Sequence, residues 1–241
     1  MSDQLRSKCK TLRLAHIAEI YDQIPFENKE QYLNDLFDEE HKLREQTKSI
    51  RLIKKAKFLD KKDLHTYEWT EQIRFPPHTS KEEICSLSFI EKGENVVLVG
   101  SPGTGKTHLA TGLGRKACEN GYEVRFYRVA HLVEELEQVL RLNKLSTFRK
   151  KLEKVDLIIL DEMGYLPFSK EGSELLFQLI SEFYEQKSLI ITSNLEFSQW
   201  NRIFVDSRLT AALVDRLIHH AHIISYQGES YRLTNALSKR K

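Results

Sequence analysis

A glycine-rich stretch of eight residues limits what this chain can fold into and bind more than any other part of its sequence does. Residues 100–107 read GSPGTGKT; they follow an apolar run, VVLV at 96–99, and precede a helix-like stretch at 108–120. Glycines let the backbone curl so that successive N–H groups point inward, and the helix N-terminus beyond adds unpaired donors and its dipole. A loop of this pattern between a strand and a helix is suited to hold a polyphosphate. We therefore predict that the chain binds a nucleoside triphosphate.

The side chains of this loop take separate roles in the predicted complex with ATP. Lys106 reaches the β- and γ-phosphates, and the Thr107 hydroxyl is placed to bind Mg²⁺. His108, the next residue, borders the nucleotide pocket at most. The predicted nucleotide contacts are Gly100, Ser101, Pro102, Gly103, Thr104, Gly105, Lys106, Thr107 and His108.

The region that holds the loop alternates short apolar runs with helix-like segments, beginning near residue 86. The strand candidates are residues 96–99, 124–127, 157–160, 189–192 and 222–225. The helix candidates that separate most of them are residues 108–120, 130–142, 173–186 and 211–219. Such alternation predicts an α/β fold in which a five-stranded parallel sheet is flanked by helices on both faces.

The first seventy residues differ, because they contain no convincing strand. Apolar residues such as Leu33, Leu36 and Phe37 recur at roughly helical spacing, which predicts a small all-α N-terminal domain. The double proline at 76–77 is the best linker candidate. We therefore expect a helical domain over residues 1–74, which binds DNA or a partner, and an α/β domain over residues 75–241.

Two acids follow the third predicted strand, at the sheet edge where open α/β folds bind ligands. Asp161 is placed to hold Mg²⁺, either directly or through water, and Glu162 can orient and deprotonate a water molecule. That water would attack the γ-phosphate, a step that a small-molecule kinase does not need. Asn194 follows the next strand and can hydrogen-bond the γ-phosphate or the attacking water, although asparagine is also common in turns.

A helix-like stretch at 209–220 carries Arg216, for which two interpretations stay open. Either it pairs locally with Asp215, or it projects into the ATP site of a neighbouring subunit and neutralises charge in the transition state. Arg202 and Arg208 are weaker candidates for the second role. The predicted catalytic residues are thus Lys106, Glu162, Asn194 and Arg216.

Charge is segregated within the helical part, although the net charge of the whole chain is only +2. Residues 19–40 carry eight acids and one lysine, and residues 41–62 carry nine bases and two acids. A basic, partly amphipathic helix suits the phosphates of nucleic acid, but an ordinary solvated helix has the same pattern. A second basic stretch, at 141–154, offers the same two interpretations. The predicted DNA contacts are Lys48, Arg51, Lys54, Lys55, Lys57, Arg149, Lys150 and Lys151.

The sequence predicts neither a membrane span nor a secretory signal, and its cysteines show no CxxC spacing. The three cysteines are far apart, so we expect a reducing cytoplasm and no disulfide framework. His219, His220 and His222 lack a second cluster of metal ligands in the sequence, and we assign them to a helix end rather than to a metal.

The set of motifs GSPGTGKT, LIILDE, ITSN and LTAALVDRLIHHAHI resembles an AAA+ ATPase of the initiator and helicase-loader clade. More narrowly, the last motif resembles the IstB-like transposition helpers, whose nearest relatives are the DnaC-type helicase loaders. The resemblance covers nearly the whole chain. It implies that residues 100–107 form Walker A, that Asp161 and Glu162 form Walker B, that Asn194 is sensor 1 and that Arg216 acts in trans.

The resemblance also implies features at two other places. Residues 141–154 stand where initiator-type relatives carry a helical insertion that faces the interior of the oligomer. Residues 226–241 are too few for the usual helical lid, so we expect the sensor 2 arginine to be missing and do not assign its place to Arg232. Hydrolysis would then depend more heavily on a neighbouring subunit.

By this resemblance the chain would be an ATP-dependent DNA-binding regulator. ATP-bound subunits would associate head-to-tail into a ring, spiral or filament on duplex DNA, largely without sequence preference, and assist a transposase. Hydrolysis would control assembly and disassembly. The alternative is a DnaC-type helicase loader that acts mainly through protein–protein contacts. A small-molecule kinase is disfavoured, since Glu162, Asn194 and Arg216 would have no role in it.

Overall fold

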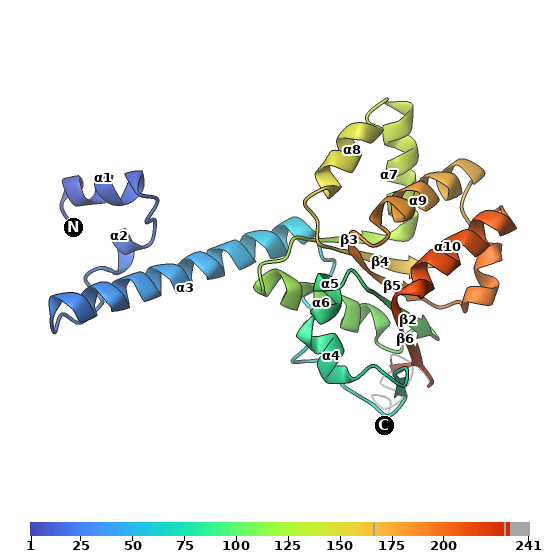
Figure 1. The fold of residues 1–241 in the computed structure, drawn as a ribbon, viewed down its shortest axis with the longest axis horizontal. Helices are drawn as coiled ribbons and strands as arrows, with labels where there is room; N and C mark the ends of the chain where they lie inside the picture. Colours follow the sequence, from blue (N-terminus) through green and yellow to red (C-terminus); the bar gives the residue numbers. More distant parts are fainter. Residues whose placement is uncertain (166, 229, 232–241) are drawn as a thin grey trace, which may run out of the picture.

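The computed structural model describes residues 1–165, 167–228 and 230–231 of the chain. Its dominant feature is a layered α/β core from which one long helix, α3 (Lys29–Ala56), projects (Figure 1). Two short helices, α1 (Asp3–Thr11) and α2 (Ile17–Ile20), lie at the far end of α3, away from the sheet. Arg232, to which no role was assigned, lies outside the described residues.

Six strands form one mixed sheet in the order β1-β6-β2-β5-β4-β3. They are β1 (Ile73–Arg74), β2 (Asn95–Gly100), β3 (Val124–Arg128), β4 (Leu157–Met163), β5 (Ser188–Ser193) and β6 (Ala221–Tyr226). The strands β2 to β6 are parallel, which confirms the five predicted strands, and β1 adds an antiparallel strand beside β6. The predicted number of strands is one too low, because a two-residue strand is too short to show a hydrophobic period.

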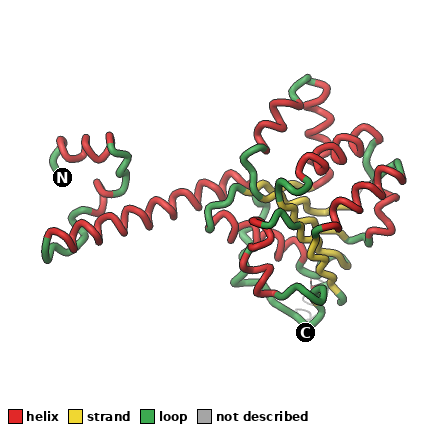
Figure 2. Tube along the Cα trace, in the orientation of Figure 1, coloured by secondary structure: helices red, strands yellow, loops and turns green. Residues whose placement is uncertain are grey.

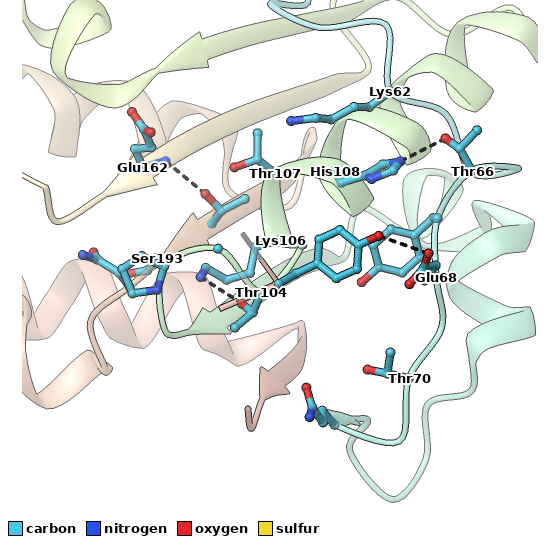
Figure 3. Close-up of a pocket in the computed structure, with 18 of the residues that line it drawn as sticks. Lys62, Thr66, Glu68, Thr70, Thr104, Lys106, Thr107, His108, Glu162 and Ser193 are labelled. Atoms are coloured by element: carbon cyan, nitrogen blue, oxygen red, sulfur yellow. Dashed lines mark hydrogen bonds between the residues drawn. The ribbon is translucent and has the colours of Figure 1, made fainter. Parts of the chain in front are cut away.

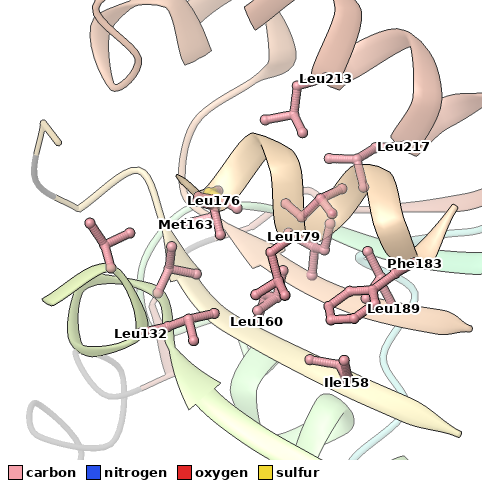
Figure 4. Close-up of a cluster of buried hydrophobic side chains, with 14 of the residues drawn as sticks. Leu132, Ile158, Leu160, Met163, Leu176, Leu179, Phe183, Leu189, Leu213 and Leu217 are labelled. Carbon is pink, nitrogen blue, oxygen red and sulfur yellow. The ribbon is translucent and has the colours of Figure 1, made fainter. Parts of the chain in front are cut away.

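Helices cover both faces of this sheet (Figure 2). In addition to those at the N-terminus they are α4 (Lys81–Ser86), α5 (Ser88–Glu91), α6 (Lys106–Glu119), α7 (Val129–Arg141), α8 (Leu145–Leu152), α9 (Lys170–Phe183), the 3₁₀ turn η1 (Phe197–Arg202) and α10 (Ser207–His219). Side chains alternate along each strand, so Ile158 and Leu160 pack with α7, α9 and α10 (Figure 4). Leu157 and Ile159 face the opposite way and pack with α6 and the end of α3.

The acidic half of α3 holds the two N-terminal helices. Glu40, which is only 4% exposed, accepts hydrogen bonds from the backbone N–H groups of His16 and Ile17, each at 2.8 Å. The other carboxylate oxygen pairs with Arg44 at 2.9 Å. A small apolar cluster lies beside these contacts and consists of Cys9, Ile17, Ile20 and Leu36. The buried carboxylate therefore caps α2 and fastens it to α3, since charge-assisted hydrogen bonds are stronger than neutral ones.

The basic half of α3 packs on the core instead. Leu52 and Ala56 belong to the hydrophobic cluster on the α6 face of the sheet, and so do Tyr67 and Ile73 further along the chain. The division at residue 74 stays a prediction, although these residues before it pack on the α/β core. Within the described ranges, no helix is both long enough and apolar enough to cross a membrane.

Candidate functional site

A cavity of about 560 Å³ opens at the carboxyl edge of the parallel strands, where the glycine-rich loop joins β2 to α6. Its walls come from the loop at 102–108, from Glu162 of β4, from 192–194 at the end of β5, and from several residues between 62 and 72 (Figure 3). Open α/β sheets bind ligands at this edge because the loops of several strands converge there. The cavity is therefore the candidate functional site.

Two glycines of the loop stand where a larger residue would be strained or would clash with its neighbours. Gly105 has a φ of 98° at the start of α6, and a Cβ on it would lie 3.3 Å from the ring of Tyr67. A Cβ on Gly100 would lie 2.5 Å from the carbonyl oxygen of Tyr226. The loop thus packs tightly between β6 and the wall at 62–72. A loop this compact presents successive backbone N–H groups to a phosphate.

Lys106 is folded back over its own loop. The residue is only 8% exposed, and its Nζ donates hydrogen bonds to the carbonyl oxygens of Gly100 at 2.6 Å and Ser101 at 2.7 Å. These two residues, predicted as nucleotide contacts, are not among the described residues that line the cavity, and their carbonyls hold the ammonium instead. The structure therefore places a positive charge at a loop shaped for a polyphosphate.

Asp161 is the centre of a small hydrogen-bond network at the end of β4. It is 1% exposed, and its Oδ1 accepts hydrogen bonds from Thr107 Oγ1 at 2.8 Å and from Thr192 Oγ1 at 2.6 Å. Thr107 and Asp161, the two predicted Mg²⁺ ligands, are thus in direct contact. Hydroxyl and carboxylate oxygens are the ligands that Mg²⁺ prefers, so the residues present fit this ion. The sequence does not identify Thr192 as a site residue, because threonine is common in strands.

Glu162 follows Asp161 with a backbone conformation that glutamate seldom adopts. Its φ is 62°, and its backbone N–H donates to Thr192 Oγ1 at 3.0 Å. Its carboxylate forms an ion pair with Arg128, whose Nε lies 3.4 Å from Oε2. Arg128 ends β3, and the register of the sheet sets it beside Asp161. Arg128 therefore contacts the carboxylate that we predict to activate water. The sequence does not reveal this contact, because it depends on the pairing of β3 with β4.

Asn194 and Arg216 lie in different surroundings. Asn194 follows β5 and lines the cavity, beside the place where the loop would hold phosphates. Arg216 lies on α10 and is not among the described residues that line the cavity. Its Nη1 donates to Ser181 Oγ at 2.6 Å, and its guanidinium lies 4.9 Å from the ring centroid of Phe177. The described contacts of Arg216 are thus with α9, rather than with Asp215 as the local interpretation expects.

The segment at 62–72 forms one wall of the cavity although it is far from the loop in sequence. Tyr67 is buried, and its hydroxyl lies 2.9 Å from that of Tyr226. Burial raises the pKa of Tyr67 to about 12, so the phenol stays neutral near neutral pH. His108 holds the segment in place, since its Nε2 lies 2.9 Å from the carbonyl oxygen of Asp63. Tyr67 belongs to no motif, and only the fold identifies it as a site residue.

The predicted DNA contacts also differ in their surroundings. Arg51 and Lys54 are exposed on the basic half of α3. Lys55 instead forms an ion pair with Glu123, which fastens α3 to the core. Arg149 turns towards α9, where its Nη1 lies 3.0 Å from a glutamate. The remaining four, Lys48, Lys57, Lys150 and Lys151, are exposed or partly exposed.

Comparisons with known proteins agree with this geometry. The ATP-binding protein named for insertion sequence IS232 of Bacillus thuringiensis subsp. berliner is 36% identical over 200 residues, which are 82% of this chain and 78% of the relative. A crystal structure of the DnaC helicase loader matches with a TM-score of 0.53 at 23% identity, over 68% of this chain and 96% of that one. The replication initiator DnaA bound to AMPPCP and single-stranded DNA matches with a TM-score of 0.57 at 21% identity, over 76% of this chain and 56% of that one. These two structures show the shared fold, and this chain spans about half of the DnaA chain.

A family match extends over almost the entire sequence. The family described as IstB-like ATP binding protein matches residues 7–239, a range that contains the glycine-rich loop, both acids of β4 and Arg216. The fold, the composition of the cavity and the similarity to insertion-sequence proteins all agree with this match. The chain therefore belongs to the family of IstB-like ATP-binding proteins.

Proposed function

We propose that this chain is an ATPase that assembles on duplex DNA and assists a transposase, with hydrolysis controlling assembly and disassembly. One observation carries the enzymatic part: the phosphate loop and Glu162 line one cavity, and the buried Asp161 binds Thr107 of that loop. The transposition role is supported by relatives whose ATP-binding proteins are named for insertion sequences.

The residues of the cavity divide the chemistry of ATP hydrolysis among them. The loop N–H groups and Lys106 bind the phosphates, and Thr107 with Asp161 would hold Mg²⁺, which neutralises phosphate charge. Glu162 orients a water molecule towards the γ-phosphate and accepts its proton. Asn194, which lines the same cavity, contributes a hydrogen bond to that water or to the γ-phosphate.

The position of Arg216 supports a site that two subunits share. Its described contacts are with α9, and it is not among the described residues lining the cavity of its own chain. In this proposal, the arginine that neutralises charge on the γ-phosphate comes from a second copy. We infer a head-to-tail arrangement in which Arg216 of one subunit completes the cavity of the next, because a head-to-tail contact can repeat around a ring or along a filament.

The basic half of α3 is the surface that we propose for duplex DNA. Arg51 and Lys54 are exposed there, and phosphate contacts of this kind bind DNA without reading its sequence. An assembly of many subunits would repeat this surface along the duplex. A protein that assists transposition in this way would work in the cytoplasm.

Replacing Arg51 and Lys54 by alanine is expected to weaken binding to duplex DNA equally for all sequences. Each lost phosphate contact lowers the slope of log K against log salt by about 0.9, so the double variant should lose about 1.8 units of slope. Fluorescence anisotropy of a labelled duplex at several salt concentrations measures this slope. The matched control replaces Lys8 and Lys10, two exposed lysines of α1, and should leave the slope unchanged. Equal slopes in all three proteins would contradict the assignment.

Replacing Arg128 by alanine is expected to raise ATP hydrolysis in the absence of DNA by about two- to fivefold. Both partners of the Arg128–Glu162 ion pair are nearly half exposed, and such pairs are worth up to about 1 kcal/mol, which is the free energy available for releasing the carboxylate. Steady-state phosphate release measures the effect, with Arg141→Ala on α7 as the control. Slower hydrolysis in Arg128→Ala would show that the arginine positions Glu162 for the reaction instead of restraining it.

A replicative helicase loader is the second candidate, since the fold matches 96% of the DnaC helicase loader structure. Phosphate release with and without duplex DNA separates the two functions, together with binding to a purified replicative helicase. Hydrolysis that duplex DNA stimulates supports the transposition function. Hydrolysis that is indifferent to duplex DNA, in a chain that binds the helicase, supports the loader.

A further inference from the structure

Away from the nucleotide cavity, α9 and α10 meet along a seam that ends in metal-ligating side chains. Arg216 of α10 contacts Ser181 of α9 at 2.6 Å. About one turn further along each helix the seam continues with Glu185, just after α9, and with His219 and His220 at the end of α10. None of these three side chains takes part in the proposed chemistry of ATP.

The three side chains of this cluster, Glu185, His219 and His220, are close enough to share one ion. Each offers one ligand atom, and these atoms lie within 4.8 Å of one another. His220 Nε2 lies 3.7 Å from Glu185 Oε1, and His219 Nδ1 lies 2.9 Å from the hydroxyl of Tyr184. Histidines that bind metals usually make a hydrogen bond through one ring nitrogen, which orients the ring for the ion. Such an orienting contact is already present at His219.

We propose that Glu185, His219 and His220 bind a divalent transition metal of the Zn²⁺ class and thereby join α9 to α10. Two imidazoles and one carboxylate suit Zn²⁺, Co²⁺ and Ni²⁺, whereas Mg²⁺ and Ca²⁺ prefer sites made of oxygen atoms. The three side chains are exposed, so small rotations bring their ligand atoms to the metal bonds of about 2.0–2.2 Å that Zn²⁺ forms. Water completes the coordination.

The fold assembles this cluster in a way that the sequence alone does not reveal. Glu185 lies in the connection from α9 to β5, His219 ends α10 and His220 joins α10 to β6, so all three are at the amino edge of the parallel strands. The third neighbouring histidine, His222, contacts other residues through both of its ring nitrogens. Its ring nitrogens lie 2.7 Å from Thr79 Oγ1 and 3.0 Å from a carboxylate oxygen of Glu94.

A metal at this site would stiffen the seam on which Arg216 rests. Arg216 lies one helical turn before the two histidines, and its guanidinium packs on α9, the helix that precedes Glu185. The inference itself stands on the ligand geometry and holds whether or not Arg216 acts on ATP. Its test therefore measures metal binding directly.

Titration of the untagged, metal-free, full-length protein with Zn²⁺ and Co²⁺ tests the proposal. We expect one Zn²⁺ per chain by isothermal titration calorimetry, and visible absorption from bound Co²⁺ that added Zn²⁺ abolishes. The double variant His219→Ala/His220→Ala should bind Zn²⁺ about 100-fold more weakly or worse, and Glu185→Gln about tenfold more weakly, because each loses ligands. Circular dichroism and thermal unfolding without metal confirm that the variants are folded.

The matched control is His131→Ala, which removes an exposed histidine of α7 and should bind Zn²⁺ as the unchanged protein does. Three results would overturn the proposal. The first is a wild-type protein that binds no Zn²⁺, and the second is binding that survives in both Glu185→Gln and the double histidine variant. The third is a loss of binding in His131→Ala as large as that in the double variant.

Discussion

Replacing Glu162 by glutamine is expected to slow ATP hydrolysis by about 10²- to 10⁴-fold while leaving ATP binding nearly unchanged. Glutamine keeps the size of the side chain but cannot accept the proton of the attacking water. In the proposed site the phosphates are bound by the loop and Lys106, which line the cavity and which the substitution does not touch. Phosphate release measures the first effect, and the binding of a fluorescent ATP analogue measures the second.

Glu162→Gln should also change how long the protein stays on DNA. If hydrolysis ends the assembly, the variant with ATP remains bound to duplex DNA after the unchanged protein has dissociated. Glu134→Gln, which changes an exposed glutamate of α7, is the matched control and should hydrolyse ATP at the normal rate. A normal rate in Glu162→Gln would show that another group activates the water.

Replacing Arg216 by alanine is expected to reduce hydrolysis by about 10³-fold or more, the range that an arginine acting on a γ-phosphate contributes. In the proposed shared site, the substitution removes a positive charge supplied to the neighbouring subunit's cavity, since Arg216 is not among the described residues lining its own. ATP binding to each subunit should change little, because the loop and Lys106 remain. Phosphate release on duplex DNA measures the loss.

The contacts of Arg216 with α9 call for a separate control. Arg216→Ala removes the hydrogen bond to Ser181 and the stacking on Phe177, which together stabilise the fold by about 1–2 kcal/mol. Ser181→Ala removes the same hydrogen bond but keeps the guanidinium, so it should retain hydrolysis. Equal losses of activity in Ser181→Ala and Arg216→Ala would mean that the arginine only stabilises the α9–α10 seam.

The parts of the site that the sequence predicts are those formed by neighbouring residues. The phosphate loop, the acids of β4 and Asn194 each stand at the end of an apolar run in the sequence. Local patterns are therefore enough to identify them. The strands β2 to β6 were predicted for the same reason. Strand β1 was not, because its two residues take their strand form from pairing with β6.

The residues that the sequence does not reveal depend on distant parts of the fold. Arg128 meets Glu162 because β3 and β4 are adjacent and in register, and Thr192 meets Asp161 because β5 lies on the other side. Tyr67 enters the cavity from a segment that packs beside β6. No local period or motif carries such information, since it exists only once the strand order is known.

The central claim, that one ATP site is formed by two subunits, is tested most directly by mixing two inactive variants. Lys106→Ala lacks the charge that binds phosphate but keeps Arg216, whereas Arg216→Ala keeps the intact loop. In a mixed assembly on duplex DNA, some interfaces combine an intact loop from one variant with Arg216 from the other. The shared site predicts phosphate release from the mixture well above the sum of the two variants measured alone. A mixture no more active than that sum would contradict it.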